Sequence, residues 1–217
     1  MSETKVFADI LSMHVISNVS DQLRKHYDLS ADQQSIGLIT TSIDDIGYTA
    51  IDEATKATDV TVVYAKSFYA GSDYSSGPLS GEFIGVVAGR SPEEVKSALD
   101  SIESSIANDL YFEAINGDSQ HLLFAKTISS CGSYLAEVAH VKAGASLAYL
   151  IAPPLESIVG IDAALKAADV EVCELFKPPS ETNFGGGILT GSQSSCEAAV
   201  DAFRDEIHRL AQRPLDY

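Results

Sequence analysis

The pattern of apolar and polar positions repeats within the chain. Residues 51–62 read IDEATKATDVTV and residues 161–172 read IDAALKAADVEV, so eight of twelve positions agree without a gap at a separation of 110. Positions 170–172 alternate apolar and polar, as in a strand. The apolar positions at helical spacing just before them are Ile161, Ala164, Leu165 and Ala168. Each copy is therefore predicted to be a helix that runs into a strand.

The repeat continues on both sides of this passage. Residues 85–89 (GVVAG) match 187–191 (GILTG) at a separation of 102, and each is followed by a polar turn and an amphipathic helix. A further strand and helix precede each copy. The predicted order in each half is strand, helix, strand, helix, strand, strand, helix, which lacks the alternating crossovers of a nucleotide-binding fold. The sequence therefore predicts an α+β protein of two similar domains, residues 1–108 and 109–217.

Composition and charge narrow the function. Of the 217 residues 45% are hydrophobic and 21% charged, as in globular proteins, and the formal net charge is -17 with a pI near 4.4. This acidity argues against nucleic acid as a partner. No apolar segment reaches the length of about 20 residues that a membrane helix needs, so we expect a cytoplasmic protein with no membrane contact. Three widely spaced cysteines indicate free buried thiols rather than disulfides or a zinc site.

Several stretches carry a family resemblance. The passage LESIVGIDAALKAADVEV resembles the signature of bacterial microcompartment shell domains, and PPSETNFGGGILTGSQSSC, CGSYL and IGLITTSIDDIGYTAIDEATKATDVTVVYAKSFYAG are similar to the ethanolamine-utilisation L class of these shell proteins, nearly end to end. The resemblance implies two tandem, circularly permuted, ferredoxin-like domains and a homotrimer with pseudo-sixfold symmetry, a pseudohexamer. It also implies a two-dimensional lattice with neighbouring shell proteins around an ethanolamine pathway.

The loop between the matched strands is eight residues longer in the first copy, where it is rich in Gly, Ser and Pro. Such a segment is by itself an ordinary surface loop. The resemblance implies instead a gate that closes a central pore, through which a large solute such as a cobalamin could pass or at which it could bind. The candidate gating residues are Tyr69, Ala70, Gly71, Tyr74, Gly77 and Gly81.

Three carboxylates form a second candidate site. Asp44 and Asp45 are adjacent, and Glu82 follows the long loop. Adjacent carboxylates are most often a solvated turn, but they also suit a primary ammonium, which carries one positive charge and three donors. The resemblance implies that these three surround a small pore that receives ethanolamine. It implies the same for Phe112, Thr182 and Asn183.

Lys56 and Lys166 occupy equivalent places in the two copies. A lone lysine is usually solvated. The resemblance implies that both lie at the edge of the oligomer and contact the neighbouring tile through stem and ammonium.

Enzyme motifs are absent from the sequence, which contains no GxSxG, HExxH or GxxxxGK. We therefore expect no catalytic residues, no metal ligands and no resident cofactor. Two hypotheses remain. The first is a structural shell tile with a gated central pore and small acidic pores. The second is a soluble trimeric sensor of a small amino metabolite that is not built into a shell.

Overall fold

The structure is a computed structural model that describes residues 4–68, 77–178 and 180–215. The chain divides into two compact units. The N-terminal unit comprises Phe7–Leu110 and Gly132–Leu135, and the C-terminal unit comprises Tyr111–Cys131, Ala136 onwards and the residues up to Val6. The predicted division after residue 108 did not anticipate that Gly132–Leu135 would group with the N-terminal unit, or the residues up to Val6 with the C-terminal unit.

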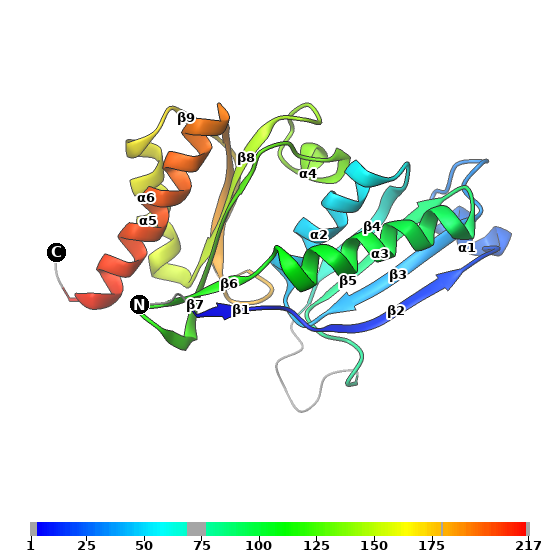
Figure 1. The fold of residues 1–217 in the computed structure, drawn as a ribbon, viewed down its shortest axis with the longest axis horizontal. Coiled ribbons are helices and arrows are strands. Elements are labelled where there is room, and N and C mark those ends of the chain that lie inside the picture. Colours follow the sequence, from blue (N-terminus) through cyan, green and yellow to red (C-terminus); the bar gives the residue numbers. More distant parts are fainter. Residues whose placement is uncertain (1–3, 69–76, 179, 216–217) are drawn as a thin grey trace. The chain divides into compact units, whose positions relative to one another are not determined.

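The N-terminal unit contains one antiparallel sheet with the strand order β2-β3-β5-β4. Helices α2 and α3 pack against each other and lie on one face of this sheet (Figure 1). The predicted element order is confirmed. In chain order the elements are β2 (Ile10–Ile16), α1 (Asp21–His26), β3 (Ser35–Thr41), α2 (Asp44–Ala57), β4 (Thr61–Ser67), β5 (Phe83–Gly89) and α3 (Pro92–Asn108).

The C-terminal unit repeats this arrangement and extends it. Its sheet has the order β1-β6-β7-β8-β10-β9, and the last four strands repeat the N-terminal order. The sequence prediction did not include β1 and β6. The elements are β1 (Lys5–Val6), β6 (Phe112–Ile115), β7 (Asp118–Ile128), α4 (Ser133–Val138), β8 (Ser146–Ala152), α5 (Pro154–Ala167), β9 (Val170–Phe176), β10 (Gly185–Gly191) and α6 (Gln193–Gln212).

The repeat extends to an irregularity of the edge strands. In β4 the pairing passes from Val62 to Tyr64 and skips Val63, and in β9 it passes from Val172 to Glu174 and skips Cys173. Each edge strand therefore carries one extra residue, a β-bulge, at the position that the internal repeat makes equivalent. The two units share register as well as strand order, which confirms the tandem fold.

Each sheet is buried on the face that its two long helices cover. In the C-terminal unit the core cluster includes Leu150 of β8, Ile161 of α5 and Phe203 of α6. In the N-terminal unit the other face is also covered, because Leu23 and Tyr27 at α1 pack on a cluster of sheet residues. A fully buried side chain of this size stabilises a fold by about 1.5–3 kcal/mol, so these clusters hold each unit together.

The helices begin where polar turns cap them. The Ser91 hydroxyl accepts a hydrogen bond from the Glu94 N–H at the start of α3, and Pro92 occupies the first turn. The Ser192 hydroxyl accepts one from the Ser195 N–H at the start of α6. Both turns are among the polar turns that the sequence placed before a helix.

Gly81 holds the end of the long loop against the sheet. Its φ is +64°, and an added Cβ would lie 2.0 Å from the Thr41 carbonyl oxygen. That carbonyl accepts a hydrogen bond from the Glu82 N–H at 2.9 Å, so it cannot move away without breaking this bond.

We expect Gly81→Ala to lower the midpoint of thermal unfolding clearly. Gly117→Ala is the control, because Gly117 has φ +81° but nothing within 4 Å of an added Cβ. Gly117→Ala should lower the free energy of unfolding by only about 1 kcal/mol, the strain of placing alanine at a positive φ. Equal losses in the two variants would contradict the close contact at Gly81.

Candidate functional site

The predicted acidic pair lies at the start of α2. Asp44 and Asp45 are only 7% and 6% exposed. The Asp45 N–H donates to the Asp44 carboxylate at 2.9 Å, and the residue before the helix, Ile43, offers no side-chain cap. Negative charge at a helix N-terminus is favoured by the helix dipole. The interpretation of a solvated turn is therefore wrong, since both carboxylates are buried.

Glu82 stands near this pair. It follows the long loop, and its backbone pairs with Thr41 on one side and Phe68 on the other. Burial and, secondly, the charge of Asp44 raise the pKa of Glu82 to about 7. Burial also raises the pKa of Tyr48, and the negative charges of Asp44 and Asp45 contribute to that rise. The structure thus brings three predicted carboxylates into one electrostatic cluster within the N-terminal unit.

The other three predicted pore residues belong to the C-terminal unit. Phe112 in β6 is 2% exposed, and its ring packs on those of Phe124 and Phe184 at centroid distances of 5.3 and 5.8 Å. Thr182 and Asn183 lie in the turn between β9 and β10, where Asn183 has φ +67°. The convergence of these residues with the three carboxylates stays a prediction.

The predicted gate falls mostly outside the described residues. Tyr69, Ala70, Gly71 and Tyr74 lie there, whereas Gly77 and Gly81 are described, both with positive φ. Beside them, Leu79 is exposed, and its carbonyl accepts a hydrogen bond from the Thr40 hydroxyl at 2.7 Å.

The two predicted edge lysines form different ion pairs. Lys56 reaches Glu53, one turn back along α2, at 2.6 Å. Lys166 reaches Asp162 along α5, because the residue equivalent to Glu53 is Ala163. Both lysines lie near a helix C-terminus, where a positive charge is favoured.

The sequence analysis missed a buried aspartate, Asp52, which is fully buried in α2. Its carboxylate oxygens accept the backbone N–H groups of Gly132 at 2.7 Å and Leu135 at 2.8 Å. Next to it, the Thr55 hydroxyl accepts the Ser133 N–H at 3.0 Å. Burial raises the pKa of Asp52, while these backbone hydrogen bonds oppose the rise. The signal that could have found it is the aspartate's recurrence as Asp162 in the second copy.

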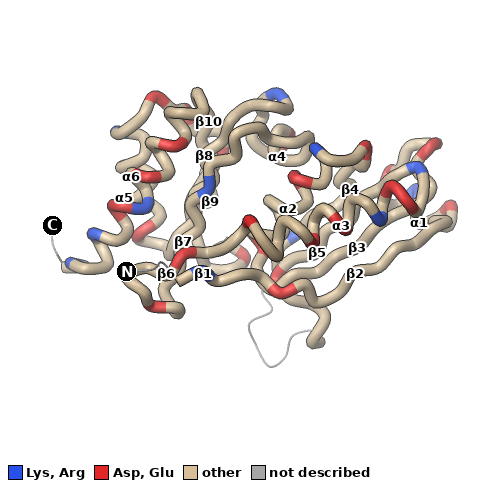
Figure 2. Tube along the Cα trace, in the orientation of Figure 1, with Lys and Arg blue, Asp and Glu red and all other residues tan. Residues whose placement is uncertain are grey.

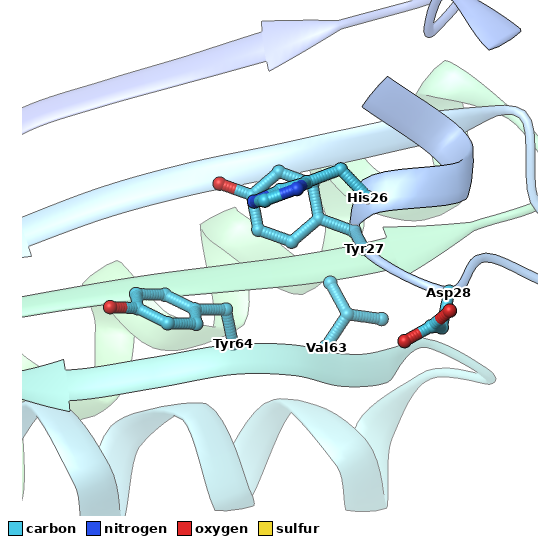
Figure 3. Close-up of a pocket in the computed structure, with 5 residues that line it drawn as sticks. All are labelled: His26, Tyr27, Asp28, Val63 and Tyr64. Atoms are coloured by element: carbon cyan, nitrogen blue, oxygen red, sulfur yellow. The ribbon is translucent and has the colours of Figure 1, made fainter. Parts of the chain in front are cut away.

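A cavity of about 430 Å³ lies apart from the predicted residues (Figure 3). His26 and Tyr27 enter it from the end of α1, Val63 and Tyr64 from β4, and Asp28 stands at one end. The two tyrosine rings meet edge to face at 6.2 Å. None of these residues was predicted to be part of a site.

Acidic side chains and cysteines are the groups that could hold a metal ion. Acidic positions are spread over both units (Figure 2). Within residues 4–68, 77–178 and 180–215, no group of three His, Cys, Asp or Glu side chains is placed to hold a metal ion. In the same part of the chain, no helix has the length and apolarity needed to cross a membrane. The three cysteines are free, and two of them, Cys131 and Cys196, are buried.

Comparison with known proteins gives consistent matches. A model of the BMC domain matches residues 35–115. The bacterial microcompartment shell protein EutL of Clostridium perfringens is 48% identical over 217 residues, which cover 100% of both chains. The crystal structure of the ethanolamine utilization protein EutL from Leptotrichia buccalis superposes with a TM-score of 0.96 at 46% identity, again over 100% of both chains. A trimeric bacterial microcompartment shell protein, PduB, shares the fold with a TM-score of 0.76 at 20% identity, over 94% of this chain and 89% of that one.

The raised pKa of Glu82 predicts a pH dependence of stability. The folded chain keeps Glu82 protonated up to about pH 7, whereas the unfolded chain ionises it near 4.5. The stabilising contribution is therefore complete below pH 4.5 and is lost as pH rises through about 7. Because Glu82 is partly exposed, the loss should not exceed about 2 kcal/mol.

Glu82→Gln should remove this loss. We expect it to unfold at a higher temperature than the unchanged protein at pH 8 and at a similar temperature at pH 4, measured by scanning calorimetry. Glu103→Gln on the exposed side of α3 is the control. A constant difference between the Glu82→Gln and unchanged proteins across this range would contradict the raised pKa.

Proposed function

Because the chain belongs to the EutL family of bacterial microcompartment shell proteins, we propose that three copies close into a pseudohexameric tile with passages for small metabolites. The observation that carries the proposal is the repeated unit. Two units with the same strand order and the same bulge can occupy six nearly equivalent wedges around a threefold axis. The fold is also that of PduB, which is described as trimeric.

The family also decides the class of protein. The chain is a structural tile of a microcompartment shell in the cytoplasm, and it assembles with other shell proteins. The prediction that it is not an enzyme is confirmed, because its relatives are shell proteins. The alternative of a soluble sensor lacks such support and would leave a trimer that never forms arrays.

The acidic cluster is proposed to receive a primary ammonium such as that of ethanolamine. Asp44, Asp45 and Glu82 concentrate negative charge in a partly buried place, where burial and, after it, the charge of Asp44 raise the pKa of Glu82 to about 7. A cation bound there would compensate the repulsion between the carboxylates. Thr182 and Asn183 are proposed to contact the hydroxyl end of the ligand, with Phe112 beside the cation.

The central opening is proposed to be closed by the loop between β4 and β5. The chain between β4 and β5 comprises residues 68–82, of which 69–76 lie outside the described residues, and the chain between β9 and β10 comprises residues 177–184. Three such segments around one axis would be long enough together to cover a central opening. Passage or binding of a large solute such as a cobalamin at that opening belongs to the same proposal.

If Lys56 and Lys166 form the lattice contact, replacing them should prevent trimers from assembling into arrays. The double variant Lys56→Asp and Lys166→Asp should form trimers but no flat hexagonal arrays in negative-stain electron micrographs, because both halves lose the cationic edge contact. The double variant Lys96→Asp and Lys142→Asp changes two exposed lysines and carries the same net charge. It should still form arrays. Arrays from the first variant would count against the lattice role, and a trimer without arrays from the unchanged protein would favour the sensor.

Binding of ethanolamine should strengthen as pH rises. The ammonium stays protonated between pH 5 and 8, whereas Glu82 ionises only near pH 7. Below that pH the ligand must displace a proton, so affinity should fall by up to about tenfold per pH unit. Calorimetric titration at pH 6 in two buffers of different ionisation enthalpy should show proton release, which Glu82→Gln should abolish and Glu103→Gln should keep. Binding that is independent of pH would contradict the role of Glu82.

A further inference from the structure

Helix α5 presents an exposed apolar stripe. Leu155, Ile158 and Leu165 are 61%, 63% and 37% exposed, and the side chain of Asp162 between them is 62% exposed. Their spacing of three, four and three residues puts all four on one side of the helix. Contiguous apolar side chains on a helix surface commonly indicate a contact with another protein.

The equivalent stripe of α2 is covered. Helices α2 and α5 are each 14 residues long and belong to the internal repeat, so Tyr48, Asp52 and Thr55 stand where α5 has Ile158, Asp162 and Leu165. The covering segment is Gly132–Leu135, which groups with the N-terminal unit. Its backbone donates to Asp52 and Thr55 as described above, and the Tyr134 ring stacks on Tyr48 with an interplanar angle of 8°.

The covering segment also has a counterpart in the repeat. Gly132–Leu135 follows β7 and begins α4, and residues 20–23 follow β2 and begin α1; both helices are six residues long. In residues 20–23 the side chains of Ser20, Asp21 and Gln22 are exposed, and no described side chain caps α1. The chain thus contains one completed contact and both halves of a second copy of that contact.

We propose that the second contact is completed between molecules: residues 20–23 of one copy cover the α5 stripe of its neighbour, with Asp162 accepting hydrogen bonds from Ser20 and the first turn of α1. The inference rests on the proposed trimer and identifies the surfaces that close it. Three identical contacts of this heterologous kind would close the ring. In the ring, the internal contact at Asp52 and the external contact at Asp162 would alternate.

The two contacts differ in a way that the residues explain. A Cβ at Gly132 would lie 2.2 Å from the Thr55 hydroxyl oxygen and 2.5 Å from the Asp52 carbonyl oxygen, so the internal contact requires glycine. Ser20 has a side chain, and the residue opposite is Leu165 rather than threonine. The external contact is therefore wider and more apolar, and the Ser20 hydroxyl can reach Asp162 in place of an N–H.

The exposed ion pair of α5 does not oppose this contact. Lys166 pairs with Asp162 in the single chain, and both side chains are well exposed. Such an exposed pair contributes little to stability, so it does not prevent Asp162 from exchanging Lys166 for hydrogen bonds at the contact. The exchange would release Lys166 toward the tile edge, where the lattice contact is proposed.

A disulfide between copies tests the proposal directly. The double variant Ser20→Cys and Asp162→Cys of the full chain is oxidised mildly and run on a non-reducing denaturing gel. We expect bands at two and three times the chain mass that reducing agent removes. Neither single variant should give the trimer band, and the unchanged protein, with its native cysteines, should give neither band. A trimer in sedimentation without any such bands would overturn this inference while leaving the proposed trimer intact.

A charge variant supplies an independent measurement. Asp162→Asn should weaken trimer formation about tenfold or more. The substitution removes the negative charge that accepts hydrogen bonds in the buried interface, and such a loss acts mainly by raising the rate of dissociation. Asp201→Asn is the matched control, since Asp201, like Asp162, is exposed and paired with a basic residue on its own helix, here Arg204. Sedimentation over a dilution series measures both. Equal association of the two variants would overturn the role of Asp162, whereas single chains at every concentration of the unchanged protein would contradict the proposed trimer itself.

Discussion

The carboxylate of Asp52 has no access to water, and a buried charge of this kind costs several kcal/mol unless hydrogen bonds satisfy it. Its donors are the backbone N–H groups of Gly132 and Leu135, more than a third of the chain away. This requirement keeps a segment that follows β7 attached to the unit that contains α2, and it explains why Gly132–Leu135 groups with that unit.

Much of the fold could be predicted because the internal repeat provides two sequences for most helices and strands, so each assignment could be checked against its equivalent. The lengths of α2 and α5 and the positions of β5 and β10 agree with the offsets found in the sequence. The strands β1 and β6 were missed for different reasons. β1 has only two residues, too few for a period. β6 is joined to β7 through Asn116 and Gly117, both with positive φ, and this dipeptide is a strong hairpin signal that the repeat concealed because the first copy has no counterpart.

The candidate site was less accessible from the sequence. The adjacency of Asp44 and Asp45 identified acidic chemistry but also suggested solvation, and only the structure shows that both are buried. The nearness of Glu82 could not be predicted from spacing, because it depends on β5 pairing with β3 beside the start of α2. The recurrence of Asp52 as Asp162 could have marked it as a residue with a structural role, but its partners Gly132 and Leu135 could not be predicted, because they lie about 80 residues away in the chain.

The bulges in β4 and β9 have a consequence for how the molecule can polymerise. Both strands lie at sheet edges, where unpaired backbone groups could recruit a strand from another chain. An extra residue at Val63 and at Cys173 twists each edge and interrupts its row of donors and acceptors. Growth by strand addition, which would lead to fibres, is thereby discouraged in both halves. A protein that must reach high local concentration and still spread in a plane benefits from that protection at every exposed margin.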